Sequence, residues 1–232
     1  TDGMVQDTQA CQSAFNLARD VPTCSAARDG TCLTPAQKDV LGQVQAGGRA
    51  ANGQPIYSAF PYDPGIAAAN WATWKFVNAV ALDPLSVGTV FTAPPAAPVN
   101  VASADIGALL AAVSATSETY RESGVSLMGP PGHEKPDNLL PLRARGAKLV
   151  LYHGVSDAIF SAEDTRQWVE RVNRSQGGAA ADFARYFPVP GMNHCSGGPA
   201  TDQFDLLGPL VKWVEQGVAP QAVPASARGA GN

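Results

Sequence analysis

The sequence predicts an α/β fold in which a parallel sheet follows a large region of helices and loops. Residues 1–140 are rich in Ala, Gly and Pro, and turn-prone segments join their short helical stretches. Residues 141–221 instead alternate apolar strands with amphipathic helices, a pattern typical of a parallel sheet that is covered on both faces. The remaining residues, 222–232 (AVPASARGAGN), predict a flexible tail.

Three stretches of the first region have helical patterns. They are TPAQKDVLGQVQ (34–45), NWATWKFVNAV (70–80) and ASADIGALLAAVSATSETYRES (102–123). Thr34 is a good N-cap because its hydroxyl can accept from a free backbone amide, and Pro35 suits the first helical position. Segments such as RAANGQP and TAPPAAPVN predict the turns between these helices.

The α/β section has four predicted elements. AKLVLYHG (147–154) and ARYFPVPG (184–191) are apolar runs of strand length. SAEDTRQWVERVNRS (161–175) is an amphipathic helix with Ser161 as its cap, and DQFDLLGPLVKWVEQG (202–217) is a final helix closed by Gly217.

The overall composition argues against nucleic acid and membranes as partners. Charged residues are 16% of the 232, and the net charge is −4, so no basic stripe is available to neutralise phosphates. No apolar run reaches the roughly 18 residues that span a bilayer. The start, TDGMVQDTQAC, lacks the basic and apolar regions of a signal peptide. Because the sequence opens on Thr1, we expect a longer parent polypeptide. We therefore infer nothing about location from the missing signal.

Four cysteines favour one disulfide within the chain. Cys24 and Cys32 flank the short polar loop SAARDGT, which lets their side chains meet. The alternative is a pair of buried thiols in a reducing compartment. Zinc is less favoured, since the sequence has neither C-x-x-C nor H-x-x-x-H spacing.

An acidic residue and a histidine follow the two predicted strands. Asp157 comes after the first and His194 after the second. Ligands and catalytic groups gather at the carboxyl ends of parallel strands, and α/β-hydrolases deliver their triad in the order Ser, Asp, His. Asp157 would then hold the imidazole of His194, which takes a proton from a nucleophile. The alternative is that Asp157 caps a turn and His194 fills a polar niche.

The nucleophile of such a triad is not evident in the sequence. A serine elbow requires G-x-S-x-G between a strand and a helix, and this motif is absent. Ser196 lies in the loop that already carries the histidine, and Ser156 adjoins the acid and suits a turn. Neither serine is predicted to be the nucleophile.

Two longer motifs resemble the tannase and feruloyl esterase family, which includes mono(2-hydroxyethyl) terephthalate hydrolases. They are H-G-x-S-D-x-x-F-S at 153–161 and G-M-x-H-C-x-G-G-P at 191–199, and a weaker likeness extends back to residue 1. The resemblance implies an α/β-hydrolase fold of which this chain is the C-terminal section, preceded by a lid domain. It also implies that Asp157 and His194 complete a triad whose serine lies in an upstream segment. That segment is not part of these 232 residues.

The resemblance also implies roles for the cysteines and for the first residues. Cys24 and Cys32 match a pair bonded to each other, whereas Cys11 and Cys195 match cysteines whose partners lie upstream. DGMVQDTQAC resembles the end of a calcium loop, to which Asp2 and the backbone carbonyl of Met4 would contribute. Two ligands cannot hold Ca²⁺ alone, so this structural ion would be shared with the upstream segment. Without the resemblance, Asp2-Gly3 would be interpreted as a turn.

Within the lid, Trp71 and Trp74 are predicted to contact the substrate. The alternative, which is the commoner role of such residues, is that they pack in the core of the lid. Phe60 and Tyr62 are weaker candidates for the same role. Between Arg49 and Arg121 the only cation is Lys75. The terephthalate monoester hydrolases pair a lid arginine with the substrate carboxylate, so this departure argues modestly against that specificity.

These observations predict a secreted or periplasmic serine carboxylic ester hydrolase that acts on esters of aromatic acids such as ferulate or gallate. No organic cofactor is expected. The expected partners are a small aromatic ester and the N-terminal half of the same enzyme, joined by disulfides. Two alternatives remain: a mono(2-hydroxyethyl) terephthalate hydrolase, and a non-catalytic accessory or binding subunit, since the chain lacks a nucleophile.

Overall fold

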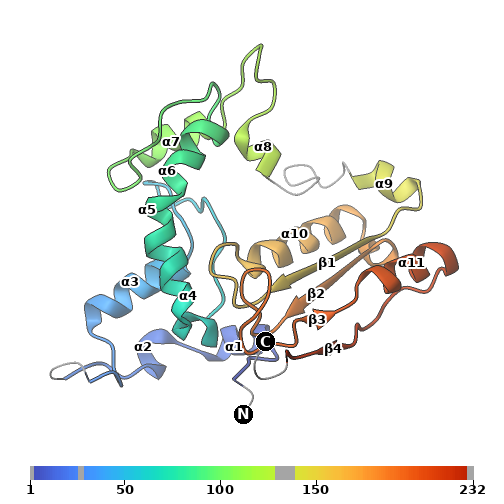
Figure 1. The fold of residues 1–232 in the computed structure, drawn as a ribbon, viewed down its shortest axis with the longest axis horizontal. Helices are drawn as coiled ribbons and strands as arrows, with labels where there is room; N and C mark the ends of the chain where they lie inside the picture. The colour runs from blue at the N-terminus through green and yellow to red at the C-terminus, as the bar shows by residue number, and fades with distance from the viewer. Residues whose placement is uncertain (1–2, 26–28, 129–138, 229–232) are drawn as a thin grey trace.

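The structure is a computed structural model that describes residues 3–25, 29–128 and 139–228. Figure 1 shows two regions: an arm of helices and loops formed by the first part of the chain, and a small α/β unit formed by the last part. Within these described ranges, no helix has the length and apolar character needed to cross a membrane.

The arm consists of short helices joined by ordered turns. Its α-helices are α1 (Thr8–Ala14), α2 (Leu17–Asp20), α3 (Pro35–Gln45), α4 (Ala69–Ala72), α5 (Ala79–Ala81), α6 (Asp83–Ser86), α7 (Ile106–Val113) and α8 (Gly124–Met128). A 3-10 turn at Pro64–Ala67 and π-helical turns at Thr73–Asn78 and Val87–Phe91 complete it. Figure 1 shows α4, α5 and α6 following one another as a column that rises away from the sheet.

Two of the three predicted arm helices are present nearly as expected. The Thr34 hydroxyl accepts from the Gln37 amide at the start of α3, and the Gln37 side chain accepts from the Thr34 amide. The helix predicted over 70–80 is α4, a π-helical turn and α5 in succession.

The helix predicted over 102–123 was too long, because only Ile106–Val113 form α7. Beyond it, the Ser117 hydroxyl accepts from the Tyr120 amide at 3.0 Å, and the Ser117 amide donates to the Tyr120 carbonyl at 2.7 Å. Such local side-chain bonding competes with helix continuation, which is why the Ser/Thr-rich end forms a turn instead.

The α/β unit begins at α9 (Leu140–Ala144) and contains β1 (Leu149–Gly154), α10 (Ala162–Ser175), β2 (Ala184–Val189), β3 (Gln203–Phe204), α11 (Leu207–Gln216) and β4 (Ala225–Ser226). A 3-10 turn at Ala180–Asp182 precedes β2. β1 and β2 are parallel, in register from Leu149 with Ala184 to Gly154 with Val189. The predicted parallel pairing is therefore confirmed, and both strands end at the same edge.

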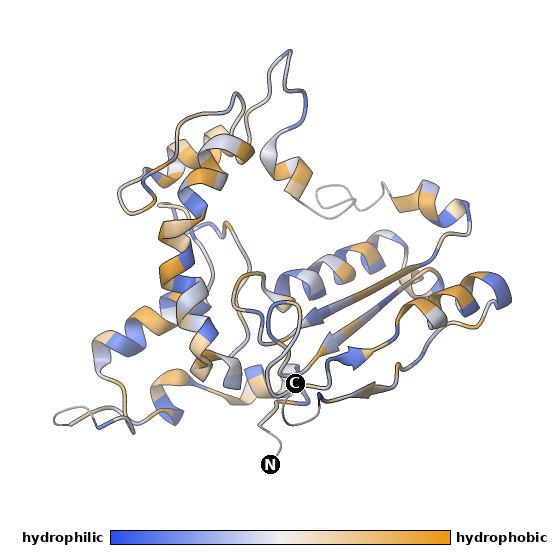
Figure 2. Cartoon of the chain, viewed as in Figure 1, coloured by the Kyte–Doolittle hydropathy of each residue, from blue (hydrophilic) through white to orange (hydrophobic). Residues whose placement is uncertain are grey.

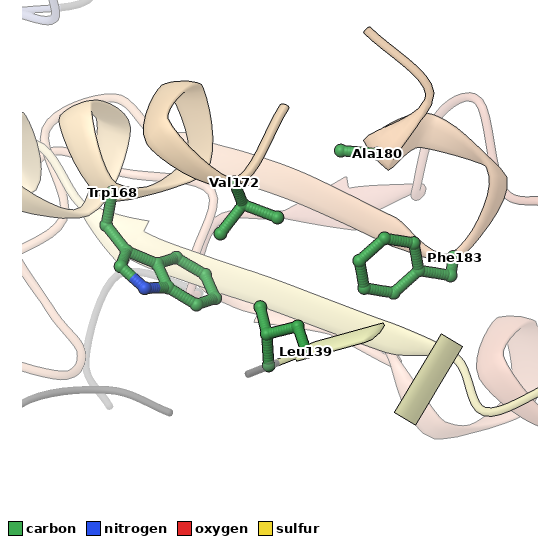
Figure 3. Packing of buried hydrophobic residues seen from close by; sticks show 5 residues of the cluster. All are labelled: Leu139, Trp168, Val172, Ala180 and Phe183. Atoms are coloured by element: carbon green, nitrogen blue, oxygen red, sulfur yellow. The ribbon is translucent and has the colours of Figure 1, made fainter. Parts of the chain in front are cut away.

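Helix α10 covers one face of this pair. Ser161 caps it by accepting from the Glu163 amide at 3.1 Å. Figure 3 shows the resulting core, in which side chains from α10 meet those of the 3-10 turn, of the residue just after it and of the segment before α9; its members are Leu139, Trp168, Val172, Ala180 and Phe183. Burying each large apolar side chain contributes about 1.5–3 kcal/mol to folding, so this core anchors the strands.

The final predicted helix begins later than expected. Gln203–Phe204 form β3, and α11 starts only at Leu207, where the Asp205 carboxylate accepts from the Leu207 and Gly208 amides. Gly217 closes the helix in the left-handed conformation, as predicted.

Part of the segment predicted as a flexible tail is a strand. Ala225–Ser226 form β4, which pairs antiparallel with β3. Arg228 adds an ion pair to Asp202 at 2.9 Å.

Arm and α/β unit are connected through the stretch from Tyr57 to Gly65, called here the lid segment. The Gln12 side chain of α1 bonds both the amide and the carbonyl of Tyr62, at 2.8 and 2.9 Å. Gln45 of α3 donates to the Pro61 carbonyl at 3.0 Å and is 2% exposed. The lid segment is thus fixed by two helices of the arm.

Candidate active site

The carboxyl end of β1 leads into a tight loop, Val155–Ser161, called here the acid loop. Asp157 lies in it and is 7% exposed. Its Oδ1 accepts from the amides of Ile159 and Phe160, at 2.7 and 3.0 Å. These two bonds fix the carboxylate plane and leave Oδ2 for other partners.

The carboxyl end of β2 leads into the base loop, residues 190–200, which carries His194. Its glycines explain the G-M-x-H-C-x-G-G-P pattern, since Gly191, Gly197 and Gly198 all have positive φ, near 71°, 76° and 82°. Asp202 closes the loop by accepting from the Gly197 amide at 2.6 Å.

The two loops bring Asp157 and His194 together. His194 Nδ1 lies 2.8 Å from Asp157 Oδ2. An ionised carboxylate can only accept, so Nδ1 carries the proton and Nε2 is left as an acceptor. This is the tautomer in which an imidazole can take a proton from a nucleophile.

Gly154, the last residue of β1, permits this approach. A Cβ at this position would collide with the Met192 carbonyl oxygen and would lie 2.8 Å from the Asn193 carbonyl oxygen. The Met192 carbonyl also accepts from the Ser156 amide at 3.0 Å. The acid loop and the base loop therefore touch through backbone, at residues within two positions of Asp157 and His194.

A second histidine, which the sequence analysis did not single out, also faces Asp157. His153 Nε2 lies 3.1 Å from the Phe160 carbonyl and 3.5 Å from Asp157 Oδ2, while its Nδ1 lies 2.7 Å from the Thr165 hydroxyl. The carbonyl can only accept, so Nε2 is the donor and Nδ1 accepts from Thr165. The H-G-x-S-D spacing was the signal that could have identified this residue.

These contacts determine the charge state of Asp157. Burial raises the pKa of its carboxyl, but hydrogen bonds from His153, His194 and the two backbone amides oppose burial, and the net pKa lies below the ordinary value. Asp157 is therefore ionised at neutral pH, as a group that orients and stabilises an imidazolium must be.

Aromatic rings from the arm and from the acid loop contact His194. The Trp74 ring lies 5.8 Å from the imidazole in an edge arrangement, and the Phe160 ring lies 5.5 Å away. Trp71 instead packs against Phe76 at 5.7 Å. The two tryptophans thus have different neighbours. In the described structure, the ring of Trp74 contacts the imidazole, whereas the ring of Trp71 contacts Phe76.

The two weaker aromatic candidates lie in the lid segment. The Lys75 ammonium lies 3.2 Å from the ring centroid of Phe60. The Tyr62 ring packs against the Phe15 ring, with the centroids 5.0 Å apart. Burial lowers the pKa of Lys75 to about 8, although the Asp157 carboxylate opposes this effect. The ammonium is therefore within electrostatic reach of the Asp157 carboxylate.

The cysteines follow two patterns. Cys24 and Cys32 form the predicted disulfide. Cys11 and Cys195 are free thiols in this structure, and Cys195 is exposed with its Sγ 3.7 Å from both ring nitrogens of His194.

The structure does not test the predicted Ca²⁺ ligands, Asp2 and the Met4 carbonyl. Asp2 lies outside the described residues. Among the residues that are described, no group of three or more His, Cys, Asp or Glu side chains could hold a metal ion.

Two cavities lie near these loops. The larger, of about 420 Å³, is lined by α10, β2 and the turn before α1, and Asp157 and His194 are not among its lining residues. The smaller, of about 10 Å³, lies between the lid segment and the acid loop, with Phe60, Asp63, Trp71, Ser156 and Asp157 among its lining residues. The lid segment therefore packs closely behind Asp157.

Comparison with known proteins gives consistent matches. A family model described as tannase and feruloyl esterase matches residues 1–231. The mono(2-hydroxyethyl) terephthalate hydrolase of Piscinibacter sakaiensis is 36% identical over 97% of this chain and 41% of that protein. A probable feruloyl esterase B of Emericella nidulans is 25% identical over 96% of this chain and 42% of that protein.

Solved structures agree in fold. Feruloyl esterase B from Aspergillus oryzae superposes with a TM-score of 0.63 at 23% identity, covering 94% of this chain and 44% of that one. The tannin acyl hydrolase from Aspergillus niger gives 0.60 at 16% identity, covering 96% and 43%. The chain spans less than half the length of these relatives.

Parallel strands that carry an acid and a histidine at their carboxyl ends are consistent with an α/β-hydrolase-like fold, as are the structural neighbours. With the family model matching nearly every residue, the chain belongs to the tannase and feruloyl esterase family. The relatives named above are carboxylic ester hydrolases.

Proposed function

We propose that the intact protein is a serine carboxylic ester hydrolase that acts on esters of aromatic acids such as ferulate or gallate. In this proposal Asp157 is the acid and His194 the base of its triad. The observation that carries it is the 2.8 Å contact between His194 Nδ1 and Asp157 Oδ2, which leaves Nε2 as the acceptor. Family membership supports the same reaction.

The reaction is acyl transfer through a serine. The serine hydroxyl attacks the ester carbonyl while His194 Nε2 accepts its proton, and the imidazolium then protonates the departing alcohol. Water hydrolyses the acyl-enzyme by the same proton transfers in a second cycle. Asp157 orients the imidazole and stabilises its positive charge throughout.

The nucleophile in this proposal comes from a segment outside these 232 residues. Among the serines of the described structure, none has a recorded hydrogen bond to His194 Nε2; Ser196 is exposed, and the Ser156 hydroxyl bonds Asp63. The relatives are more than twice as long as this chain, which leaves room for such a segment. Cys11 and Cys195, both free here, are proposed to bond to it, and Asp2 and the Met4 carbonyl are proposed to share a structural Ca²⁺ with it.

Trp74 and Trp71 are proposed to contact the aromatic acyl group. The position of Trp74 against His194 supports this role, because a ring bound there would lie next to the proton-transfer group. The disulfide supports export to an oxidising compartment, either the periplasm or the medium.

A second candidate is hydrolysis of mono(2-hydroxyethyl) terephthalate, favoured by the 36% identity to the Piscinibacter sakaiensis enzyme. That substrate carries a free carboxylate, for which the lid offers Lys75 rather than arginine. Steady-state kinetics of the intact protein on methyl ferulate, methyl gallate and the terephthalate monoester separate the candidates. The proposal expects the two methyl esters to give the higher kcat/KM. No hydrolysis of any ester would instead support the accessory-subunit alternative.

A further inference from the structure

The lid segment and the acid loop, far apart in the sequence, are joined by hydrogen bonds at both ends of the acid loop. At one end, the Ser161 amide donates to the Tyr57 hydroxyl at 2.8 Å. The Ser161 hydroxyl donates to the Ala59 carbonyl at 2.6 Å. Ser161 is fully buried, so water cannot replace these bonds.

At the other end, the Ser156 hydroxyl donates to Asp63 Oδ2. The Asp63 carboxylate is itself fixed, because its Oδ1 accepts from the Gly65 amide at 3.0 Å. Gly65 lies so near that a Cβ there would come within 2.5 Å of the Ser156 Cβ. Ser156 is 5% exposed, so this contact is also shielded from water.

Asp157 lies between these two attachments. In the part of the chain that the structure describes, the hydrogen bonds to its Oδ1 come from two amides of the acid loop, those of Ile159 and Phe160. The direction of its Oδ2, and thus the contact with His194, depends on the path of the backbone between Ser156 and Ser161. The lid segment fixes that path at both ends.

We propose that Tyr57 and Asp63 of the lid segment are positioning residues, which set the orientation of Asp157 toward His194 by holding the acid loop. The inference rests on the proposed function, because it assigns these residues a role in the same reaction. It extends that function, because the lid segment would then support the triad in addition to any contact that the arm makes with the substrate.

A double-mutant cycle in the intact protein tests the proposal, with methyl ferulate as substrate. Tyr57→Phe removes one hydroxyl and should lower kcat about tenfold or more while KM changes less than twofold, since small displacements of catalytic groups are costly. In an Asp157→Asn background the same change should have little further effect on the residual kcat, because the carboxylate that it positions is gone.

Tyr186→Phe is the matched control. Tyr186 is another half-buried tyrosine, and its hydroxyl donates to the Ala162 carbonyl at 3.3 Å, one residue beyond the acid loop. It should keep kcat within about twofold, as expected for residues outside the coupled set. Ser156→Ala, which removes the other attachment, provides the second test if Tyr57→Phe fails to fold.

Two results would overturn the proposal: a Tyr57→Phe or Ser156→Ala protein that folds and keeps its kcat, or an equal fold-loss with and without Asp157. Failure of the proposed function gives a different result, since Asp157→Asn alone would then leave turnover unchanged.

Discussion

The indole of Trp74 meets the imidazole of His194 at an interplanar angle of 74°, with the ring centroids 5.8 Å apart. Phe160 contacts the same imidazole from the acid loop at 5.5 Å. Trp74 from the arm and Phe160 from the acid loop thus restrict the orientation of the ring that is proposed to transfer the proton.

Trp74→Ala should lower kcat/KM for methyl ferulate in the intact protein about two- to tenfold, because an aromatic pair contributes about 0.5–1.5 kcal/mol beyond simple burial. Trp74→Phe should restore part of the loss. Val77→Ala, at an exposed position three residues along, is the control and should have no effect. Wild-type kinetics of the Trp74→Ala protein would show that the indole has no role in the reaction.

Asp157→Ala and His194→Ala should each lower kcat by about three to six orders of magnitude, as losses of triad members do. The two changes together should lower kcat little further than one alone, because the residues act as a unit. Circular dichroism should show that the variants fold. Retention of near-wild-type turnover by either variant would contradict the assignment of the pair.

The ionised carboxylate of Asp157 should stabilise the fold in a pH-dependent way. Its pKa is lower in the folded protein than in an unfolded chain, so its contribution is present above the unfolded pKa and is lost as pH falls through the folded pKa. Urea unfolding should therefore show a lower midpoint for Asp157→Asn at about pH 7, and the difference should shrink below about pH 4. A difference that grew on acidification would be inconsistent with this sign.

Lys75 should have the opposite effect. Burial lowers its pKa to about 8, whereas a lysine in an unfolded chain stays protonated to about pH 10.4. The folded state is therefore disfavoured at neutral pH and gains stability as pH rises from about 8 to about 10.4. Lys75→Met should raise the urea midpoint at about pH 7 and differ little at about pH 10.5. Lys212→Met, at an exposed position, should show neither effect.

Gly154→Ala should separate the acid loop from the base loop. The added methyl group has no room beside the Met192 carbonyl, and such overpacking costs about 1–3 kcal/mol of folding free energy. Gly42→Ala is the matched control, because Gly42 lies within α3 and its Cβ would approach Leu17 at an ordinary 3.9 Å. That control should be neutral or stabilise by up to about 1 kcal/mol. Thermal unfolding of both variants, alongside ester turnover, checks the prediction.

Sequence patterns were sufficient for the individual elements and for the pairing of the two strands. The strand pair, α10 with its Ser161 cap, and the Thr34 cap all follow from hydrophobic periodicity and capping chemistry. Asp157 and His194 could be paired because parallel strands place their carboxyl ends at one edge.

Contacts between distant segments were not predictable in this way. Tyr57 and Asp63 lie in a loop without periodicity, and their partners in the acid loop lie about a hundred residues away. The contact of His153 with Asp157 was not predicted, because His153 is the penultimate residue of a strand and a histidine at such a position usually packs against its neighbours. The π-helical turns between α4 and α5 also have no simple sequence signature, so the different surroundings of Trp71 and Trp74 could not be foreseen.

The ion pair between Arg228 and Asp202 has a practical consequence for anyone who produces this protein. Asp202 also holds the Gly197 amide in the base loop, so the C-terminal stretch is linked to His194 through one carboxylate. A clone trimmed after residue 221, where the sequence suggests a dispensable tail, would lose β4 and Arg228 together. Any choice of C-terminal boundary, or of a purification tag placed there, is therefore also a choice about the loop that carries the histidine.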